Sequence, residues 1–574
     1  MNLPRHIALT ARRAGRAARG KRPAAFDRPC IPPDRSRCDA GFHHGLLAGA
    51  LLAVLAAPAL AGTGAAEGAL GGEVTDGGGA PLPGVMITAH DGRRGVSTTV
   101  FTDAAGRFGL PELRPGSYRV TARRIGFATQ TRDDVAHDGP ALRFALPEKP
   151  DFAEDLPAAY WYSQLTWPDV GSHANFARAC ANCHQIGDWA WRVPRDEAEW
   201  EAVLERMDRR GPPLYARSRA GLIEKLMKTF GPDAPAPDFE PPAPPSGAVL
   251  RAVIREYAVD RERGTSCHDL EPGADGRMYT EEGYWLDPRT LDRGVFPIGP
   301  GAHSIERAGN GDFWITVTGS DELVRLDPET GQVDRHAHPE IDGDRGVYPH
   351  TLRFDARQQI WYTLTASNHL ARFDPRTAQF EYHRLPGGTD DPEELSGAAI
   401  AYGSDIAPDQ SIWWSQLLGP RIGRYDPASG EMRAWTTPYS GPRRLRVAGD
   451  GMVWVPFFGH ARLGRFDPRS EEWKTWELPT GPAGTELPYA LAIHPRTGDV
   501  WITGSNSDTL IRFQPATEQF DVFPLPTPVS WTREIEFDAR GHVWTCTSDA
   551  RIAADREGVS RFIELELPAG NAAE

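Results

Sequence analysis

Hydrophobic and polar positions alternate in short runs along most of this chain, and Gly, Pro, Asn or Asp ends most of the runs. This period of two predicts β-strands joined by tight turns, over residues 69–148 and again over 248–574. Residues 152–232 instead space their apolar side chains three and four apart, as in DEAEWEAVLERMDRRG and SRAGLIEKLMKTFG, which predicts helices. We therefore expect a mainly β, multidomain chain with one small α-helical part.

The segment 248–574 repeats a single unit seven times. Each copy has a hydrophobic residue followed by an aromatic one on its second strand, and most copies carry Asp-Pro on the third strand. Short four-strand units of this kind favour closure into a ring over a linear solenoid, so a seven-bladed β-propeller is predicted. The aromatic positions are Tyr279, Trp314, Trp361, Trp413, Trp454, Trp501 and Trp544.

The position eleven residues before that aromatic residue is expected to open the innermost strand of each blade. Side chains at this position converge on one mouth of the central channel. The first three copies carry His268, His303 and His350 there. Three imidazoles could bind a divalent metal or exchange protons near neutral pH, and the alternative is three unrelated surface histidines. The later copies carry Tyr402, Arg443, Tyr489 (displaced by one residue) and Arg533.

The helical part contains the sequence Cys-Ala-Asn-Cys-His at residues 180–184, the C-x-x-C-H pattern of covalent haem c attachment. The thiols of Cys180 and Cys183 could bond to the two vinyl groups of one haem c, with His184 as proximal iron ligand. A chance dithiol or half of a zinc site is the alternative, although no second ligand pair follows nearby. Met207 and then Met227 are the candidates for the distal ligand, and each could equally be a core residue. A histidine or an open position is the other option.

The N-terminal residues 1–61 combine a basic stretch with an apolar run ending in Ala59-Leu60-Ala61. This arrangement predicts a secretory signal peptide cleaved after Ala61, and hence a periplasmic or secreted protein. The alternative is an uncleaved membrane anchor, but the run is shorter than the roughly 20 residues that span a bilayer. We expect membrane contact only through this segment.

Composition and charge narrow the function classes. Charged residues make up 25% and apolar residues 40% of the chain, which excludes wholesale disorder. The formal net charge is −15, and residues 1–61 hold ten Lys/Arg against three Asp/Glu, which leaves −22 on the remainder. So acidic a surface repels phosphate backbones and excludes nucleic-acid binding, whereas it would steer a basic redox partner protein.

Two further cysteines lie in the propeller region. Cys267 precedes His268 in the first repeat, and Cys546 lies on the second strand of the seventh. These repeats become neighbours when the ring closes, so a disulfide between them is one interpretation in an oxidising compartment. Two separate buried thiols are the other, because a disulfide requires closely spaced Cα atoms.

Residues 69–148 resemble the carboxypeptidase regulatory-like β-sandwich. The resemblance rests on Gly84-Val85, on Thr102-Asp103 with Gly106-Arg107-Phe108, and on Pro115-Gly116-Ser117-Tyr118. It implies an accessory module without chemistry of its own. Residues 152–232 resemble a small cytochrome c domain through the haem-attachment pattern, and a Pro-rich linker at 233–247 separates them from the repeats.

The repeats themselves resemble the propeller of virginiamycin B lyase (streptogramin lyase), in GDFWITVTGSDELVRLDPETG and PHTLRFDARQQIWYTL. That family opens a cyclic depsipeptide antibiotic by elimination, with His and Glu residues at the channel mouth and magnesium. The resemblance implies catalytic roles for His303 and His350 with Glu281 or Glu282. Later repeats lack the acid that often follows the second strand in that family and carry Val317, Leu364, Gln416, Phe457 and Gly504.

These observations favour an exported c-type haem protein that carries electrons and holds a small-molecule substrate or a partner at the mouth of a lyase-like propeller. Two alternatives stay open. One is a metal-dependent lyase of the streptogramin lyase type. The other is a non-catalytic module of the cell envelope, in which the haem acts as a sensor.

Overall fold

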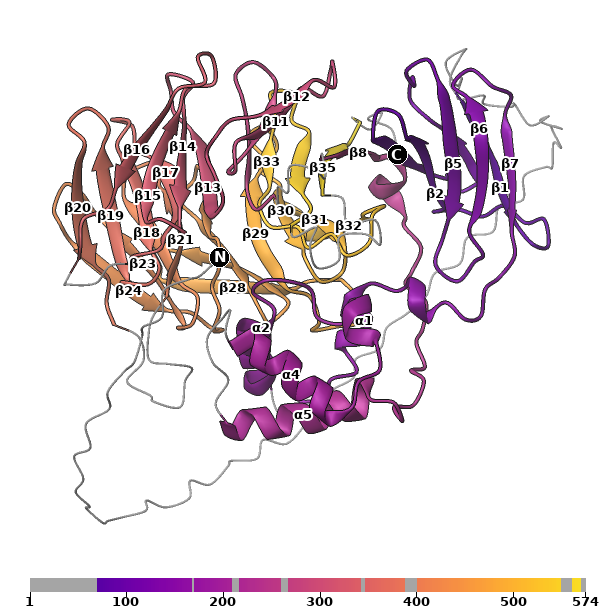
Figure 1. The fold of residues 1–574 in the computed structure, drawn as a ribbon, viewed down its shortest axis with the longest axis horizontal. Coiled ribbons are helices and arrows are strands. Elements are labelled where there is room, and N and C mark those ends of the chain that lie inside the picture. Colours follow the sequence, from indigo (N-terminus) through magenta and orange to yellow (C-terminus); the bar gives the residue numbers. More distant parts are fainter. Residues whose placement is uncertain are drawn as a thin grey trace, which may run out of the picture. The chain divides into compact units, whose positions relative to one another are not determined.

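The computed structural model describes residues 70–167, 170–208, 216–259, 267–341, 346–387, 400–548 and 560–568. The predicted signal segment 1–61 lies outside these residues. Residues 64–574 form one compact unit (Figure 1), built mainly from small β-sheets. Among the described residues, no helix combines the length and the apolar character needed to span a membrane.

Seven strands at the N-terminal end of the described chain form a β-sandwich around a core that includes Val74, Ile87, Val120 and Phe144. One sheet has the order β4-β1-β7, and the other face consists of β3-β2-β5-β6. The strands are β1 (Gly71–Asp76), β2 (Met86–Asp91), β3 (Val96–Phe101), β4 (Arg107–Gly109), β5 (Ser117–Arg123), β6 (Gln130–Ala136) and β7 (Leu142–Leu146).

Six four-stranded antiparallel sheets follow, each made from four consecutive strands. The first three sheets contain β9 (Leu270–Pro272), β10 (Met278–Thr280), β11 (Tyr284–Leu286) and β12 (Arg293–Val295); β13 (Ala302–Arg307), β14 (Phe313–Val317), β15 (Glu322–Leu326) and β16 (Val333–Ala337); and β17 (Pro349–Phe354), β18 (Ile360–Leu364), β19 (His369–Asp374) and β20 (Gln379–Arg384). The next three contain β21 (Ala401–Ile406), β22 (Ile412–Gln416), β23 (Arg421–Tyr425) and β24 (Met432–Thr436); β25 (Arg446–Val447), β26 (Val453–Phe457), β27 (Arg462–Asp467) and β28 (Glu472–Glu477); and β29 (Pro488–Ile493), β30 (Val500–Gly504), β31 (Thr509–Gln514) and β32 (Gln519–Pro524).

The recurring Asp-Pro has a structural explanation in these sheets. Asp327 Oδ1 accepts the backbone N–H of Glu329 at 2.9 Å, and Asp374 Oδ1 accepts that of Arg376 at 2.9 Å. Such Asx turns replace the ladder hydrogen bonds that the chain loses as it turns from the third strand into the fourth. The repeat therefore records a turn between the two outer strands of each blade.

The last sheet joins the two ends of the propeller. Strands β33 (Glu536–Phe537), β34 (Val543–Cys546) and β35 (Arg561–Glu566) continue into β8 (Val253–Ala258), which precedes the first blade in the chain. The other edge of β8 pairs antiparallel with β3 of the sandwich, so this sheet has eight strands. Cys267 and Cys546 form a disulfide that also links the first blade to the last.

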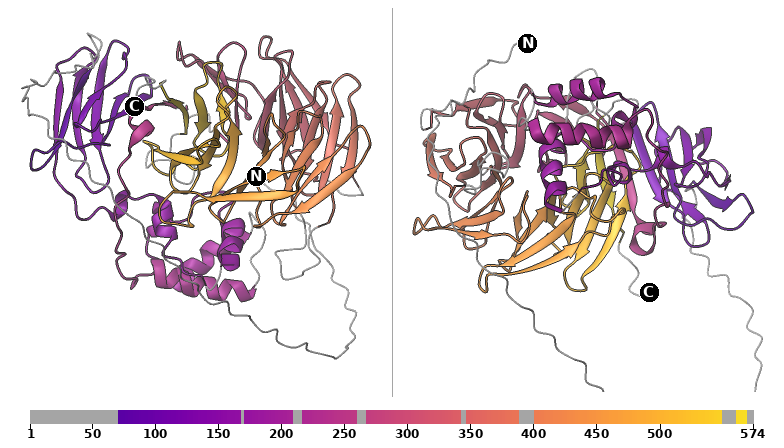
Figure 2. Two further views of the ribbon diagram at one scale, coloured as in Figure 1. Left: turned by 180° about the vertical axis from the view of Figure 1, so that it is seen from behind. Right: turned by 90° about the horizontal axis from the view of Figure 1, so that it is seen from below.

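The expectation of a small α-helical cytochrome c domain is wrong. The described residues contain five α-helices of 4 to 15 residues, and these are grouped together beside the sheets (Figure 2). Their apolar side chains share one core with propeller residues such as Tyr402, Phe458 and Trp531. The helices are α1 (Ala158–Tyr162), α2 (Val170–Cys180), α3 (Trp189–Arg192), α4 (Glu197–Asp208) and α5 (Ala216–Phe230), with the 3₁₀ turns η1 (Ala153–Asp155) and η2 (Gly247–Arg251).

The physical reason is that helical periodicity identifies a buried stripe but not the surface that buries it. Here α2 lies so close to the fifth blade that a Cβ at Gly459 would lie 3.1 Å from the carbonyl oxygen of Ala174. Gly459 also has φ +90°, a conformation that residues with a side chain rarely adopt. The chain is thus mainly β, with a helical segment that is built against the propeller.

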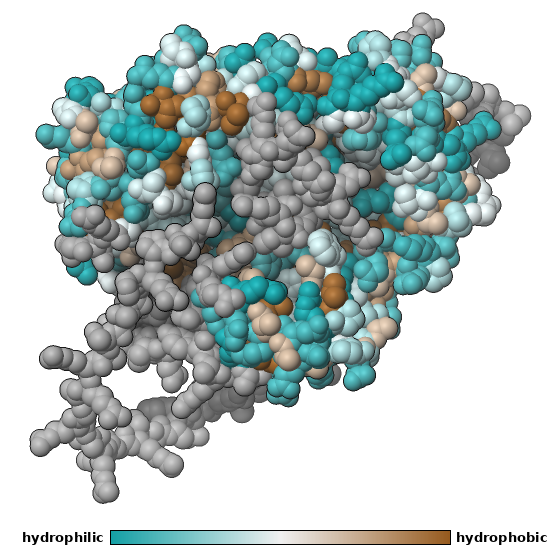
Figure 3. Space-filling view, viewed as in Figure 1, coloured by the Kyte–Doolittle hydropathy of each residue, from teal (hydrophilic) through white to brown (hydrophobic). Residues whose placement is uncertain are grey.

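The exterior is mostly hydrophilic on the face that Figure 3 shows, and apolar residues are scattered there. Trp189 and Val193, near α3, are among the large apolar side chains that remain exposed. Scattered single apolar residues of this kind are ordinary on a folded protein.

Candidate functional site

The seven aligned positions of the repeats come together at one mouth of the propeller. His268 precedes β9, His303 lies in β13, and His350 lies in β17, each at the start of the first strand of its blade. The ring centroids of His268 and His303 are 3.9 Å apart, as are those of His303 and His350. The ring of Tyr402, in β21, follows at 4.1 Å from His350. The predicted histidine cluster is therefore present as a continuous row of rings.

Hydrogen bonds close this row into a ring, which we call the mouth ring. Arg443 Nη2 donates to the Tyr402 hydroxyl at 2.8 Å, and the hydroxyls of Tyr402 and Tyr489 are 2.7 Å apart. The Tyr489 hydroxyl lies 3.1 Å from His268 Nε2. Arg443 stacks on the Tyr489 ring at 3.6 Å, and the Arg533 guanidinium lies 5.5 Å from the same ring. The mouth ring consists of His268, His303, His350, Tyr402, Arg443, Tyr489 and Arg533.

The three imidazoles are held neutral. Burial lowers the pKa of His268, His303 and His350 well below that of a free imidazole, and the cation of Arg444 acts in the same direction. Neutral imidazoles carry a lone pair and can accept a proton or a metal.

The two tyrosines are shifted in opposite directions. Burial raises the pKa of Tyr402, which therefore keeps its proton. Burial alone would also raise the pKa of Tyr489, but the charges of Arg443, Arg533 and Arg444 outweigh it and leave that pKa lowered. The mouth ring thus holds one firm proton donor beside one phenol of unusual acidity.

A layer of charged residues supports the mouth ring from below. Arg444 pairs with Asp269 at 2.7 Å and also with Glu534, and Arg446 pairs with Glu534 at 2.6 Å. Asp269 Oδ1 in turn lies 2.7 Å from His268 Nδ1. All of these carboxylates are buried and hydrogen-bonded, as buried charges must be.

The donor set best arranged for a metal differs from the predicted one. Ligand atoms of His268, Asp269 and His303 all lie within 4.8 Å of one another. His303 Nδ1 is buried with no hydrogen-bond partner among the described residues. His350 lies outside this set, and its Nδ1 lies 2.9 Å from Thr351 Oγ1. Both ring nitrogens of His268 also have partners, Asp269 and the Tyr489 hydroxyl, which a bound metal would have to displace in part. Sequence reasoning missed Asp269, although its position directly after a mouth-ring histidine was a signal.

The predicted acids of the first blade occupy different places. Glu281 accepts the backbone N–H groups of His268 at 2.8 Å and of Asp269 at 3.1 Å, so it fixes the backbone that carries those two side chains. Burial raises the pKa of Glu281 well above its ordinary value. Glu282, the next residue, is half-buried. The structure thus brings His303 and His350 together and gives Glu281 a supporting position.

The haem-attachment sequence lies at the C-terminal end of α2. Cys180 ends that helix, and both Cys180 and Cys183 are free thiols. His184 Nδ1 lies 2.8 Å from the carbonyl oxygen of Gln185, to which it can only donate, so Nε2 carries the lone pair. A backbone carbonyl that accepts from the other ring nitrogen is a usual partner of a metal-ligating histidine. Two unbonded thiols and an oriented imidazole are the donor set that a covalent haem requires, so these residues fit the group.

Hydrogen bonds attach this segment to the sixth blade. Gln185 Nε2 donates to the Ser505 carbonyl and to Asp508, each at 2.7 Å, and the Ile186 N–H donates to Asn506 Oδ1 at 3.1 Å. Gln185 is fully buried. The position of the segment is therefore specified by side chains of the propeller.

The same segment also touches the mouth ring. Arg533 Nη2 donates to the Cys183 carbonyl at 3.2 Å. Tyr348, which is 42% exposed, stacks beside His350 with ring centroids 6.3 Å apart. Burial raises the pKa of Tyr348, and Tyr489, Arg533 and Cys183 are close enough to influence it. The two predicted sites, far apart in the sequence, are thus neighbours in space.

The predicted distal ligands lie on the other helices. Met207 is half-buried in α4, and Met227, in α5, packs against the core that the helices share with the propeller. Asp208, next to Met207, is close enough for its charge to raise the pKa of Cys180. The end of α4 therefore lies near the first thiol of the motif.

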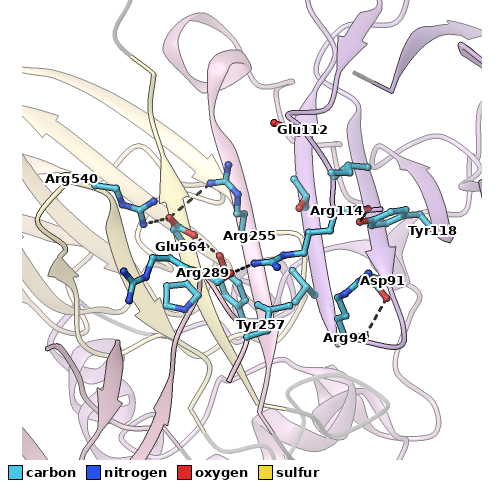
Figure 4. Close-up of a pocket in the computed structure, with 15 residues that line it drawn as sticks. Asp91, Arg94, Glu112, Arg114, Tyr118, Arg255, Tyr257, Arg289, Arg540 and Glu564 are labelled. Carbon is cyan, nitrogen blue, oxygen red and sulfur yellow. Dashed lines mark hydrogen bonds and ion pairs between the residues drawn. The ribbon is translucent and has the colours of Figure 1, made fainter. Parts of the chain in front are cut away.

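A separate cavity of about 300 Å³ lies where the sandwich meets the last blade (Figure 4). Glu564 lies at its centre and accepts from Arg540 at 2.8 Å and from the Tyr257 hydroxyl at 2.7 Å. Arg94, on the sandwich side, pairs with Asp91. Because these charged groups pair with one another, we interpret the cavity as part of the contact between the sandwich and the propeller.

Comparisons with known proteins agree with this architecture. Residues 69–146 match the carboxypeptidase regulatory-like domain family. No curated protein matches the chain. Among solved structures, selenomethionine-substituted virginiamycin B lyase from Staphylococcus aureus is 17% identical, with a TM-score of 0.46 over 55% of this chain and 100% of that one. A streptogramin B lyase structure is 16% identical, with a TM-score of 0.46 over 56% and 100%.

A third similar structure is the hydrazine synthase of Kuenenia stuttgartiensis. It is 11% identical, with a TM-score of 0.41 over 53% of this chain and 96% of that one. These are similarities of fold, and they assign no activity to this chain.

Proposed function

We propose that the chain is a c-type haem protein that exchanges electrons with a small molecule or a partner protein at the mouth ring. Cys180 and Cys183 would hold one haem by thioether bonds, and the Nε2 atom of His184 would ligate its iron. The proposal rests mainly on one contact. Arg533 of the mouth ring donates to the carbonyl of Cys183, so the haem donor set and the mouth ring are neighbours. A bound haem c would supply one-electron chemistry at this place.

The residues around the motif have defined parts in this proposal. Gln185 holds the segment on the sixth blade and, through its carbonyl, fixes the orientation of the His184 ring. Neutral His268 and the acidic phenol of Tyr489 can accept or release the protons that accompany electron transfer. Arg443 and Arg533 make the mouth positive inside a chain that is acidic overall, which favours an anionic substrate.

The test is production of the full chain together with a haem c attachment system. We expect covalent haem bands in the reduced spectrum, retained after denaturation and precipitation, and a polypeptide mass increased by one haem. C180S/C183S should be colourless, whereas N182A, which leaves the three donors in place, should bind haem as the unaltered chain does. A colourless protein with the mass of its amino acids alone contradicts the proposal.

The set of His268, Asp269 and His303 favours a second candidate function, a metal-dependent lyase. A neutral imidazole pair with one carboxylate suits Zn²⁺ or a similar ion better than Mg²⁺, which prefers oxygen ligands. Incubation with a type B streptogramin and either ion should then open the ring, and H303A should abolish the reaction. Absence of ring opening with both ions would exclude this activity on that substrate.

A further inference from the structure

Within the part of the chain that the structure describes, Arg443 is a buried cation without a carboxylate partner. Its side chain is 1% exposed, and Nη2 donates to the Tyr402 hydroxyl. Its Nε and Nη1 atoms are buried and have no acceptor among the described residues. A buried guanidinium costs several kcal/mol of desolvation unless an acceptor or a counter-charge offsets it.

Other donors around the same place also lack acceptors. Arg533 Nε and Trp531 Nε1 are buried and unpartnered within the described residues. Both side chains, like Arg443, contact the ring of Tyr489, at 5.5 Å for Arg533 and 6.3 Å for Trp531. Unsatisfied donors of this kind are rare in native proteins, and here several surround one aromatic ring.

The nearby carboxylates do not supply the missing acceptors. Asp269 and Glu534 are already bound to Arg444, and Glu534 also binds Arg446. These four residues pair with one another, so among the described residues no carboxylate pairs with Arg443 or Arg533.

The position of Tyr489 does not allow its hydroxyl to act as the counter-ion of Arg443. Arg443 lies over the face of the Tyr489 ring, 3.6 Å from the centroid, and the Tyr489 hydroxyl is engaged by Tyr402 and His268. The contact is therefore a cation–π stack. The unpartnered Nε and Nη1 hydrogens still need an oxygen acceptor.

We propose that the mouth ring contains a binding site for a small oxyanion, held by Arg443 together with Arg533 and Trp531. The ligand class is a carboxylate or an inorganic oxyanion, because several N–H donors and two cations are available to it. Half-exposed Arg533 and exposed Tyr348 and Cys183 mark the side from which it enters. This site does not depend on haem attachment; it rests on the anionic substrate proposed above for the mouth and names its chemical class.

Anion titration of the full chain as purified tests the proposal. Sodium acetate and sodium phosphate are titrated by isothermal calorimetry at pH 7, in sodium chloride buffers of constant ionic strength. We expect saturable binding of at least one probe and a matching rise in the unfolding temperature. Saturation by acetate alone indicates an organic carboxylate as ligand, and saturation by phosphate alone indicates an inorganic oxyanion.

Matched variants assign the binding to this site. R443M should weaken the affinity at least about tenfold, the effect of losing hydrogen bonds to a charged group. R465M is the control. Arg465 belongs to the same blade and also lies over an aromatic ring, with its guanidinium 5.8 Å from the ring centroid of Trp454, but it is in β27 and not in the mouth ring. W531F, which removes one neutral donor, gives a second measurement if R443M does not fold.

The outcomes separate this proposal from the haem proposal. Binding that persists in colourless C180S/C183S supports an anion site independent of the haem. Absence of saturable binding of both probes to the unaltered chain, or equal affinity in R443M, W531F and the unaltered chain, overturns the site and means that water alone satisfies Arg443. Neither of those results bears on whether haem is attached.

Discussion

The two thiols of the attachment motif have opposite surroundings. Cys180 is packed against the shared core, and burial, with a contribution from the charge of Asp208, raises the pKa of its thiol to about 12. Cys183 is exposed. Because the thiolate is the reactive form, Cys183 is expected to be the more reactive thiol of the folded segment, where Cys180 is half-buried and keeps its proton.

This difference gives a prediction for protein made without a haem attachment system. At pH 8, iodoacetamide should modify Cys183 at least about tenfold faster than Cys180 in the folded chain. Peptide mass mapping over time measures both rates in one sample. In guanidinium chloride the two rates should become similar, and similar rates in the folded chain would contradict the structure.

The repeat alignment predicted which residues reach the channel mouth, because each repeat fixes the strand position of its own side chain. It placed His268, His303 and His350 correctly at one mouth, where the structure shows them in contact. It could not predict the role of Glu281, which accepts backbone N–H groups. Hydrogen bonds to the backbone depend on how two strands turn toward each other, and a linear pattern does not record that.

Among the strands, the first strands of four blades carry a carboxylate that is buried or half-buried, namely Glu271, Glu306, Asp405 and Glu536. Burial, reinforced by the charges of Glu534 and Glu306, raises the pKa of Glu536, in β33, to about 8. The folded state then holds a proton that the unfolded chain releases above about pH 4.5. The contribution of Glu536 to the free energy of unfolding is therefore fully present below about pH 4.5 and is lost as the pH rises through about 8.

E536Q should therefore behave differently from the unaltered chain as pH rises. We expect similar free energies of unfolding near pH 5 and a more stable E536Q at pH 9, because glutamine stays neutral throughout. Denaturant unfolding at several pH values measures the difference. E472Q, at an exposed position of β28, is the control and should follow the unaltered chain. A constant difference between E536Q and the unaltered chain at all pH values would refute the shifted pKa.

The helices show what element-level patterns leave open. Their periodicity correctly predicts α4 and α5, yet the same apolar stripe could enclose a cofactor, pack on another helix or pack on a sheet. In the structure the stripe packs on a sheet, because Leu204 and Leu226 share one hydrophobic core with Tyr489 of the propeller. Long-range contacts such as those of Gln185 with the sixth blade distinguish these options, and they link residues some 320 positions apart.

At the scale of the whole molecule, the sequence indicated the ring and its repeat number but not how the sandwich attaches to it. Strand β8 ends one blade and also pairs with β3, so the sandwich covers an edge that would otherwise offer free N–H and C=O groups. Edge pairing uses backbone groups that every residue carries, so no residue pattern predicts it. The accessory module thus protects the seam at which the ring closes.

The disulfide acts on the same seam, and its removal tests how the ring is held closed. Cys267 and Cys546 are 279 residues apart, so their bond restricts a very long loop in the unfolded chain. C267S/C546S should lower the free energy of unfolding by about 2–5 kcal/mol, measured by denaturant titration under oxidising conditions. The variant should still fold, because the pairing of β8 with β35 closes the ring independently. Dithiothreitol should destabilise the unaltered chain and leave the variant unchanged; equal sensitivity of the two would show that the bond contributes nothing to closure.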